Sequence, residues 1–409
     1  MNERTDTATP VSTVTVTPAG KLLRGADISE LISELKATHE RKVDVVVDTR
    51  TIEAHDGKIH VTNPTTADLV VAPERSMVDT MSARLKLPAQ LMRELNERGN
   101  ETPGGDDIDQ ALQVMTRAGD YAKAFDDLVN ARVRHEAPSA VMLRTYTPAD
   151  GDSGMTPHVG RAWLSNRFRI VDNLEVLLTV LQGVQAAGMD GLQVSGADLG
   201  PSRMRVRFVA PAVEYVATEL ARGYRSPFMR GDDRPPVVWA GFEVSNGELG
   251  DGTFGVTPRA ELLICRNGMT RTADIVSTRH LGGKLEVGQV DWADDTQQAN
   301  LRTIQLKARD AIVQFLSFDY LEGLVKELDG KAAAPIAEPV KALEVVSKDL
   351  GMSEEEATNL LDRFMGTGQT NRAAGVFNAI TELAQLTADP DRAAYLEANA
   401  TRAMELAAR

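Results

Sequence analysis

The chain has a single cysteine, Cys265, among its 409 residues. One thiol cannot form a disulfide within the chain, and chains without disulfides are typical of reducing compartments. No stretch approaches the roughly 20 apolar residues that a helix needs to cross a bilayer. The first residues lack the charged and then apolar segments of a secretory signal. We therefore expect a cytoplasmic protein with no membrane partner.

Motifs for nucleotide-driven and nucleophilic chemistry are also missing. The sequence has no GxxxxGK[ST] phosphate loop and no GxSxG nucleophile motif. Its six histidines are scattered, and only His55 and His60 lie close together, across an Asp-Gly turn. That spacing does not match a zinc site. We therefore expect that the protein is neither an ATP-driven motor nor a zinc enzyme. We predict no catalytic residue and no cofactor.

Positive charge is in deficit over the whole chain but not over its middle. The net charge is −14, which argues against a protein that coats DNA with its entire surface. Residues 131–310 hold equal numbers of acidic and basic residues, and 19 of their 21 basic residues are Arg. Arg contacts phosphates in bidentate geometry and stacks on bases, which Lys does poorly. A GC-rich genome would also favour Arg, so this bias has two explanations.

The pattern of apolar residues predicts an α+β fold with a central antiparallel sheet and packed helices. In chain order we expect a disordered tail (1–20), a small α+β unit with a helical segment (21–131), a central α+β core (132–328), an Ala/Pro linker (329–338) and an acidic helical C-terminal domain (339–409).

Several local patterns predict individual elements. Asp27 or Ser29 is placed to cap a helix over residues 27–42, and Asp172 or Asn173 to cap a second one. Asp56 and Gly57 predict the turn of a hairpin. One long amphipathic helix is expected over residues 294–327, and a capping box starts at Ser353.

Residues 203–209 alternate between Arg and apolar side chains. The pattern predicts a strand with Arg203, Arg205 and Arg207 on one face and apolar residues on the other. Two further β-prone runs, within residues 239–271, flank a connection rich in Gly and Asn. They predict a hairpin with a shaped polar loop.

Two stretches match a known pair of sequence blocks. One is HVGRAWLSNRFRIVDNLEVL at residues 158–177, and the other is VSNGELGDGTFGVTP followed by LLICRNGM within residues 239–271. Together they resemble the signature of a phage and plasmid protein family, the domain of unknown function nine-three-two, over roughly residues 130–310. That family looks like a distant relative of the phage single-strand annealing recombinases of the RecT and Erf type. The signature positions are Asn173, Asn246, Glu248, Arg266 and Asn267.

The resemblance and the Arg-rich middle favour an ATP-independent protein that binds and anneals single-stranded DNA. It would serve recombination or replication of a phage or mobile element in the bacterial host cytoplasm, as a homo-oligomer. Single strands are bound by positive grooves interleaved with aromatic side chains, so we expect the candidate residues to share one groove. The candidates are Arg161, Trp163, Arg167, Phe168, Arg169, Arg203, Arg205, Arg207, Arg225 and Arg230, beside Tyr224 and Phe228.

Two alternatives remain from the sequence. Glu243, Glu248 and Asp251 could hold Mg²⁺ for an enzyme acting on nucleic acid, although acids on a Gly-rich loop more often fix the turn. The acidic helices over residues 339–409 could instead bind a host protein without any catalysis.

Overall fold

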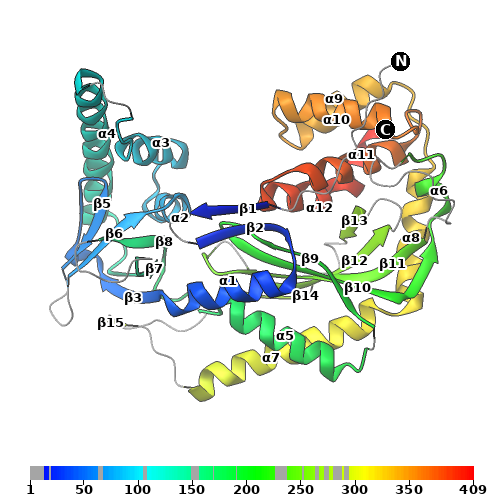
Figure 1. Cartoon of the computed structure of the whole chain (residues 1–409), viewed down its shortest axis with the longest axis horizontal. Helices are drawn as coiled ribbons and strands as arrows, with labels where there is room; N and C mark the ends of the chain where they lie inside the picture. The colour runs from blue at the N-terminus through cyan, green and yellow to red at the C-terminus, as the bar shows by residue number, and fades with distance from the viewer. Residues whose placement is uncertain are drawn as a thin grey trace.

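The chain forms two β-sheets flanked by helices in a computed structural model (Figure 1). The structure describes residues 13–17, 20–62, 68–104, 108–148, 156–168, 170–189, 191–225, 237–250, 253–262, 267–270, 276–279, 288–289 and 294–409. These residues form one eight-stranded and one seven-stranded sheet, followed by a C-terminal region made of helices. The predicted α+β class is therefore confirmed.

The seven-stranded sheet and three helices form the N-terminal arm, at the left of Figure 1. Its strands run in the order β15-β3-β7-β8-β6-β5-β4, and only the β6–β8 pair is parallel among the described strands. The strands are β3 (Lys42–Asp48), β4 (Ile52–His55), β5 (Lys58–Val61), β6 (Leu69–Pro73), β7 (Ala140–Tyr146), β8 (His158–Ser165) and β15 (Gly288–Gln289), with the short helix η1 (Thr49–Thr51) between β3 and β4. The helices are α2 (Arg75–Leu85), α3 (Ala89–Gly99) and α4 (Ile108–His135).

The eight-stranded sheet lies in the middle of the molecule. Its order is β1-β2-β9-β10-β11-β12-β13, and β14 pairs with β12. The strands are β1 (Thr13–Thr17), β2 (Gly20–Ala26), β9 (Gln193–Leu199), β10 (Arg203–Val216), β11 (Val237–Gly247), β12 (Thr253–Leu262), β13 (Asn267–Thr270) and β14 (Val276–Arg279). One face is covered by α1 (Ile28–Glu40), α5 (Asn173–Ala186) and α7 (Asp294–Phe315), with α6 (Thr218–Ala221) and α8 (Phe318–Ala332) at the far end.

The alternation in β10 decides which face of this strand meets which layer. Met204 and Val206 are fully buried in the core that includes residues of α5 and α7. The intervening Arg205 and Arg207 point to the opposite face, where they meet α12. The predicted polar face of the strand is therefore present, but helices cover it.

The C-terminal arm consists of α9 (Pro339–Asp349), α10 (Glu354–Gly366), α11 (Ala373–Leu386) and α12 (Pro390–Ala407). Ser353 and Glu356 form the predicted capping box at the start of α10. All described side chains of α11 except its last residue are buried, so this helix forms the centre of the arm. The predicted linker is packed rather than extended, because Ala332 ends α8 at 0% exposure and Ile336 is 6% exposed.

Most local predictions are confirmed. Asp27 accepts hydrogen bonds at the start of α1, and Asp172 is the N-cap of α5. Asp56 and Gly57 have φ values of 53° and 68°, which suit the tight β4–β5 turn. The helix expected over 294–327 is two helices, because Ser317 caps a new one and breaks the run.

The structure differs from the predicted domain boundaries. Residues 13–17 of the expected tail form β1, which pairs with β2. β1, β2 and α1 join the eight-stranded sheet and its core, whereas β7 and β8 pair with strands from the first third of the chain. Periodicity predicts which segments are strands but not which strands pair with one another. The sequence therefore did not show that each sheet combines segments far apart in the chain.

Glu382 on α11 should make stability depend on pH. It is 2% exposed and accepts a hydrogen bond from the Tyr224 hydroxyl at 2.6 Å. Burial raises its pKa from 4.5 to about 7. The folded state therefore holds this proton more tightly, and its contribution to stability falls as pH rises from about 4.5 through 7. In the unmodified protein the free energy of unfolding should fall by about 2 kcal/mol between pH 5 and pH 8, and Glu382→Gln should abolish this pH dependence. Urea unfolding at the two pH values measures the effect.

Glu355→Gln provides the matched control, because Glu355 is exposed on the neighbouring helix α10. It should keep the pH dependence of the unmodified protein. An unchanged slope in Glu382→Gln would show that the buried carboxyl is not the group that titrates.

Candidate functional site at the junction of the two sheets

The two sheets meet at a buried cluster of charged side chains centred on Arg144 of β7. Arg144 is 0% exposed. Its Nε and Nη2 donate to the two carboxylate oxygens of Asp44 at 3.0 Å each, and Nη2 also donates to Asp172 at 2.7 Å. Its Nη1 donates to the backbone carbonyl of Glu248 at 2.9 Å. One guanidinium therefore joins β3, the start of α5 and the loop after β11.

The two sequence blocks that carry the family resemblance meet in this cluster. Arg161 of β8 donates to Oε2 of Glu248, and the backbone N–H of Asn173 donates to Oε1 of Glu248 at 2.5 Å. The side-chain amide of Asn246 donates to Oδ1 of Asn173 at 2.9 Å and to the carbonyl of Val171 at 3.1 Å. Three of the five signature positions are thus bonded to one another.

Charges in the cluster balance. Lys42, Arg144 and Arg161 face Asp44, Asp172 and Glu248. Burial alone would raise the pKa of the Asp172 carboxyl, but Arg144 and Lys42 hold it well below its usual range. Such paired groups are stable in a low-dielectric interior only while every partner is present.

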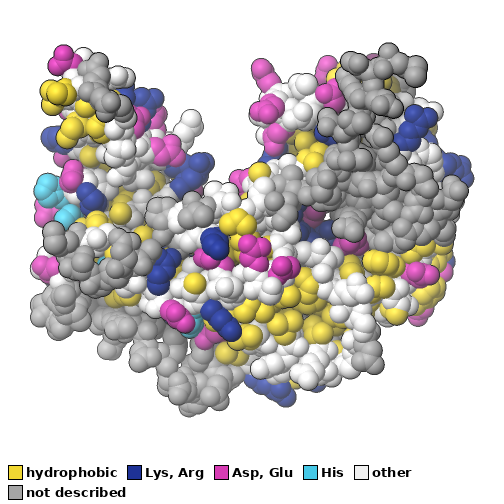
Figure 2. Space-filling view, viewed as in Figure 1, with side chains coloured by type: hydrophobic (Ala, Val, Ile, Leu, Met, Phe, Trp, Pro, Cys, Tyr) yellow, Lys and Arg dark blue, Asp and Glu magenta, His cyan; other side chains and the backbone are white. Residues whose placement is uncertain are grey.

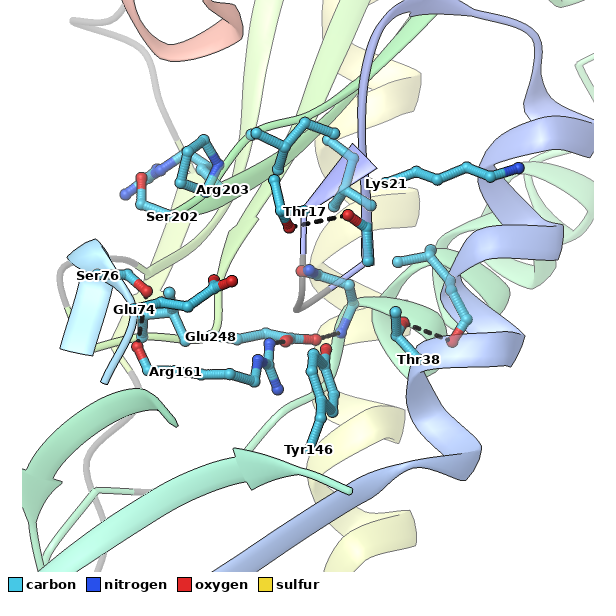
Figure 3. A pocket seen from close by; sticks show the side chains of 18 of the residues that line it. Thr17, Lys21, Thr38, Glu74, Ser76, Tyr146, Arg161, Ser202, Arg203 and Glu248 are labelled. Atoms are coloured by element: carbon cyan, nitrogen blue, oxygen red, sulfur yellow. Dashed lines mark hydrogen bonds and ion pairs between the residues drawn. The ribbon is translucent and has the colours of Figure 1, made fainter. Parts of the chain in front are cut away.

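A cavity of about 390 Å³ adjoins this cluster. Its lining comes from the β1–β2 hairpin, α1, the start of α2, the turn between β9 and β10, and the start of α5. Figure 3 shows Glu74 and Thr38 on opposite sides of the cavity, with Tyr146 and Glu248 between them. Burial raises the pKa of Tyr146 to about 12, so its hydroxyl keeps its proton at neutral pH, and the Arg161 guanidinium lies 4.1 Å from its ring centroid.

The lining carries more positive than negative side chains, although the whole chain is acidic. It holds His39 together with the cations Lys21, Lys42, Arg75, Arg161 and Arg203 and the carboxylates Glu74, Asp172 and Glu248. Lys42 and Arg161 are already bound to Asp172 and Glu248. The other three cations lie nearer solvent: Lys21 and Arg75 are exposed and Arg203 is half-buried. Arg75 also lies 4.0 Å from the exposed Glu97, so an anionic ligand would compete with that carboxylate for Arg75.

The predicted stacking residues are core residues, which corrects the sequence interpretation. Trp163 is 0% exposed and lies in the core of the N-terminal arm, and Phe168 is 7% exposed in a smaller cluster. Arg161 is likewise buried, against Glu248. None of these three can contact a strand on the surface. The residue pattern around them does not show that both faces of β8 are covered. For that reason the sequence suggested that these side chains were accessible.

Arg205 and Arg207 are neutralised by acids, which is the second correction. Arg205 donates to Asp391 of α12 at 2.8 Å. Arg207 is 4% exposed, donates to Asp198 at 2.5 Å, and lies 3.8 Å from Glu397 of α12. Both are thus held between the sheet and α12 and do not form an open groove with the Arg161 block.

The remaining predicted contacts have mixed outcomes. Arg167 and Arg225 are exposed, and Arg203 lines the cavity. Asn267 begins β13, whose side chains are not described. Other predicted positions lie outside the described residues: Arg169, Phe228, Arg230, Asp251, Cys265 and Arg266.

The acids of the alternative metal site are engaged in different places. Glu243 lies 3.4 Å from Arg207 on the face that α12 covers, whereas Glu248 binds Arg161 at the sheet junction. Among the described residues there is no group of three His, Cys, Asp or Glu that could hold a metal ion. The geometry therefore does not bring Glu243 and Glu248 together as ligands.

Sequence reasoning missed Arg144, Asp44 and Tyr146. A signal was present, because Arg144 interrupts the apolar run VMLRTY and Asp44 interrupts VDVVV. A charge inside a β-prone run that is otherwise apolar predicts a buried ion pair, since an unpaired buried charge is too costly.

Comparisons with protein-family models, with curated proteins and with solved structures found no match to this chain. Within the described part of the chain, no helix combines the length and the apolar character needed to cross a membrane.

Proposed function

We propose that the protein binds single-stranded DNA and anneals complementary strands without ATP, in recombination or replication of a phage or mobile element. The site is redrawn from the sequence prediction. The strand contacts the cations around the junction cavity, and the buried Arg and aromatic residues of β8 and β10 hold the fold together. Base pairing between the two strands supplies the sequence recognition.

The observation that carries the proposal is the excess of positive charge around the cavity in a chain of net charge −14. Phosphates are attracted to such a local patch, while the acidic remainder of the surface repels DNA from other places. The same cavity adjoins Asn173 and Glu248, where the two signature blocks meet. The resemblance and the local charge thus support the same location.

The shape of the molecule also supports this location. Figure 2 shows a hollow between the N-terminal arm and the C-terminal arm. β1 and α2, which contribute to the cavity lining, lie at the base of this hollow in Figure 1. Arg75, which lines the cavity, is the first residue of α2.

The test is salt-dependent binding of fluorescein-labelled oligodeoxythymidine, followed by anisotropy. Each phosphate contact on a single strand contributes about 0.7 to the slope of log K against log salt concentration. We expect the double variant Lys21→Ala with Arg75→Ala to bind about tenfold more weakly, with a slope reduced by about 1.4. Annealing of complementary oligonucleotides should proceed equally with and without ATP.

A matched control removes two exposed cations that do not line the cavity. Lys36 lies on α1, and Arg50 has an 88% exposed side chain. The double variant Lys36→Ala with Arg50→Ala should bind like the unmodified protein. Equal weakening in both double variants would contradict the placement of the site, and the absence of salt-dependent binding in the unmodified protein would contradict the function.

The remaining partners stay predictions. The sequence predicted a homo-oligomer, and a host protein bound by the C-terminal helices was one of its alternatives. Apolar side chains are available on that arm for such a contact, because Val340, Val345 and Met365 are 59%, 50% and 62% exposed. Size-exclusion chromatography with light scattering would measure the oligomer.

A further inference from the structure

The walls of the junction cavity are apolar, in contrast to its rim. Leucines from five segments line it: Leu22 of β2, Leu35 of α1, Leu174 of α5, Leu199 of β9 and Leu249 after β11. Phosphates and sugars gain nothing from leucine walls. A flat, weakly polar ring system does gain, because its faces leave water on entering.

The base of the cavity is polar and fixed in place. The Glu248 carboxylate is held by Arg161 and by the backbone of Asn173. The protonated Tyr146 hydroxyl interacts with Thr38. Preformed polar groups beneath apolar walls are the usual composition of a small-molecule site, where a few hydrogen bonds fix the orientation of a mostly apolar ligand. The edge of a nucleobase carries donors and acceptors that suit such a base.

The size of the cavity selects among ligands. At about 390 Å³ it falls within the roughly 300–1,000 Å³ of small-molecule sites, which is enough room for one nucleobase. The cations Lys21, Arg75 and Arg203 belong to the same lining, so the phosphates flanking a base in the cavity would lie near positive charge.

We propose that this cavity takes one nucleobase out of the stack of the bound single strand. The leucine walls enclose the base, the Glu248–Tyr146 floor meets its edge, and the neighbouring phosphates lie at the cationic rim. This inference rests on the proposed function, which it makes specific. Unstacking a base costs least in a single strand, and the cavity offsets that cost by burying the ring.

The experiment compares two strands with the same sugar-phosphate backbone, one with bases and one without. One is an oligodeoxythymidine, and the other carries tetrahydrofuran abasic units along the same backbone. Burying the faces of one base removes apolar surface from water, so the unmodified protein should prefer the base-bearing strand by about tenfold. A strand with a single 2-aminopurine should brighten on binding, since its fluorescence rises when the base leaves the stack.

Filling the cavity should remove this preference. Leu174→Trp places a large side chain in the cavity, whereas Leu178→Trp puts the same side chain one turn further along α5, where Leu178 is 44% exposed and outside the lining. We expect similar affinity for both strands in Leu174→Trp and the unmodified preference in Leu178→Trp. Leu199→Trp fills the cavity from β9 and serves as the second filling variant if Leu174→Trp does not fold.

The outcomes separate the two proposals. Equal affinity of the unmodified protein for the base-bearing and abasic strands overturns the base cavity and leaves single-strand binding intact. A preference that survives in both filling variants also overturns it. If neither strand binds, the proposed function itself fails.

Discussion

Replacing Arg144 with Met is expected to lower the free energy of unfolding by about 3–5 kcal/mol. Arg144 is fully buried and is bonded to Asp44, Asp172 and the carbonyl of Glu248. Methionine has a similar length but no charge, so two buried carboxylates lose their main counter-ion. The cost arises from those uncompensated charges rather than from the lost volume.

The size of this loss should depend on pH. In the unmodified protein the Asp172 pKa is depressed, so its ion pairs contribute stability above about pH 4 that disappears as pH falls through the folded-state pKa. Arg144→Met raises that pKa, because burial remains and one cation is gone. The deficit of the variant should therefore be largest near neutral pH and shrink as pH falls and the Asp172 carboxyl takes up its proton.

Urea unfolding of the variant and of the unmodified protein at neutral and acid pH measures both effects. Arg50→Met is the matched control, because its side chain is 88% exposed beside Asp48, and exposed pairs contribute only about 0–1 kcal/mol. A loss in Arg144→Met no larger than in this control would mean that the cluster does not hold the sheets together.

Trp163→Ala is expected to cost about 3–5 kcal/mol of stability, whereas Trp163→Phe should cost less than about 1.5 kcal/mol. Trp163 is fully buried against the core that contains Phe125 and Val129. Its indole Nε1 has no hydrogen-bond partner among the described residues, so phenylalanine gives up no bond. Alanine leaves a cavity that a packed core cannot close.

This pair of variants also separates the core role from the role expected from the sequence. A stacking residue would lose strand affinity in Trp163→Ala and keep its stability. We expect the reverse, with reduced stability by urea unfolding and unchanged affinity of the folded fraction for oligodeoxythymidine. Weakened binding by a stable Trp163→Ala protein would restore the stacking assignment.

The sequence was informative about elements and much less so about partners. Alternation placed Arg203, Arg205 and Arg207 on one face of β10, and this is correct. The sequence did not predict that α12 covers this face. Asp391 of α12 binds Arg205, but most of the C-terminal half of the chain separates the two residues in the sequence. Periodicity describes which face is polar, while only the folded chain shows whether water or another helix meets it.

The candidate site was partly predictable for a related reason. The resemblance selected Asn173, Asn246 and Glu248, and the structure brings all three together. The cavity beside them needed β1, which lies in the segment expected to be disordered. A cavity lined by many separate segments, from Thr17 to Leu249, leaves no local pattern in any one of them.

The pairing of strands that are far apart in the sequence has a consequence for the synthesis of the chain. Leu23 of β2 pairs with Leu199 of β9, so the first strands leave the ribosome long before their neighbour exists. At about 5–20 residues per second, β2 waits on the order of 10–35 s with an unsatisfied edge. During that time it is a binding site for chaperones or for other nascent chains, and slower translation would lengthen the exposure.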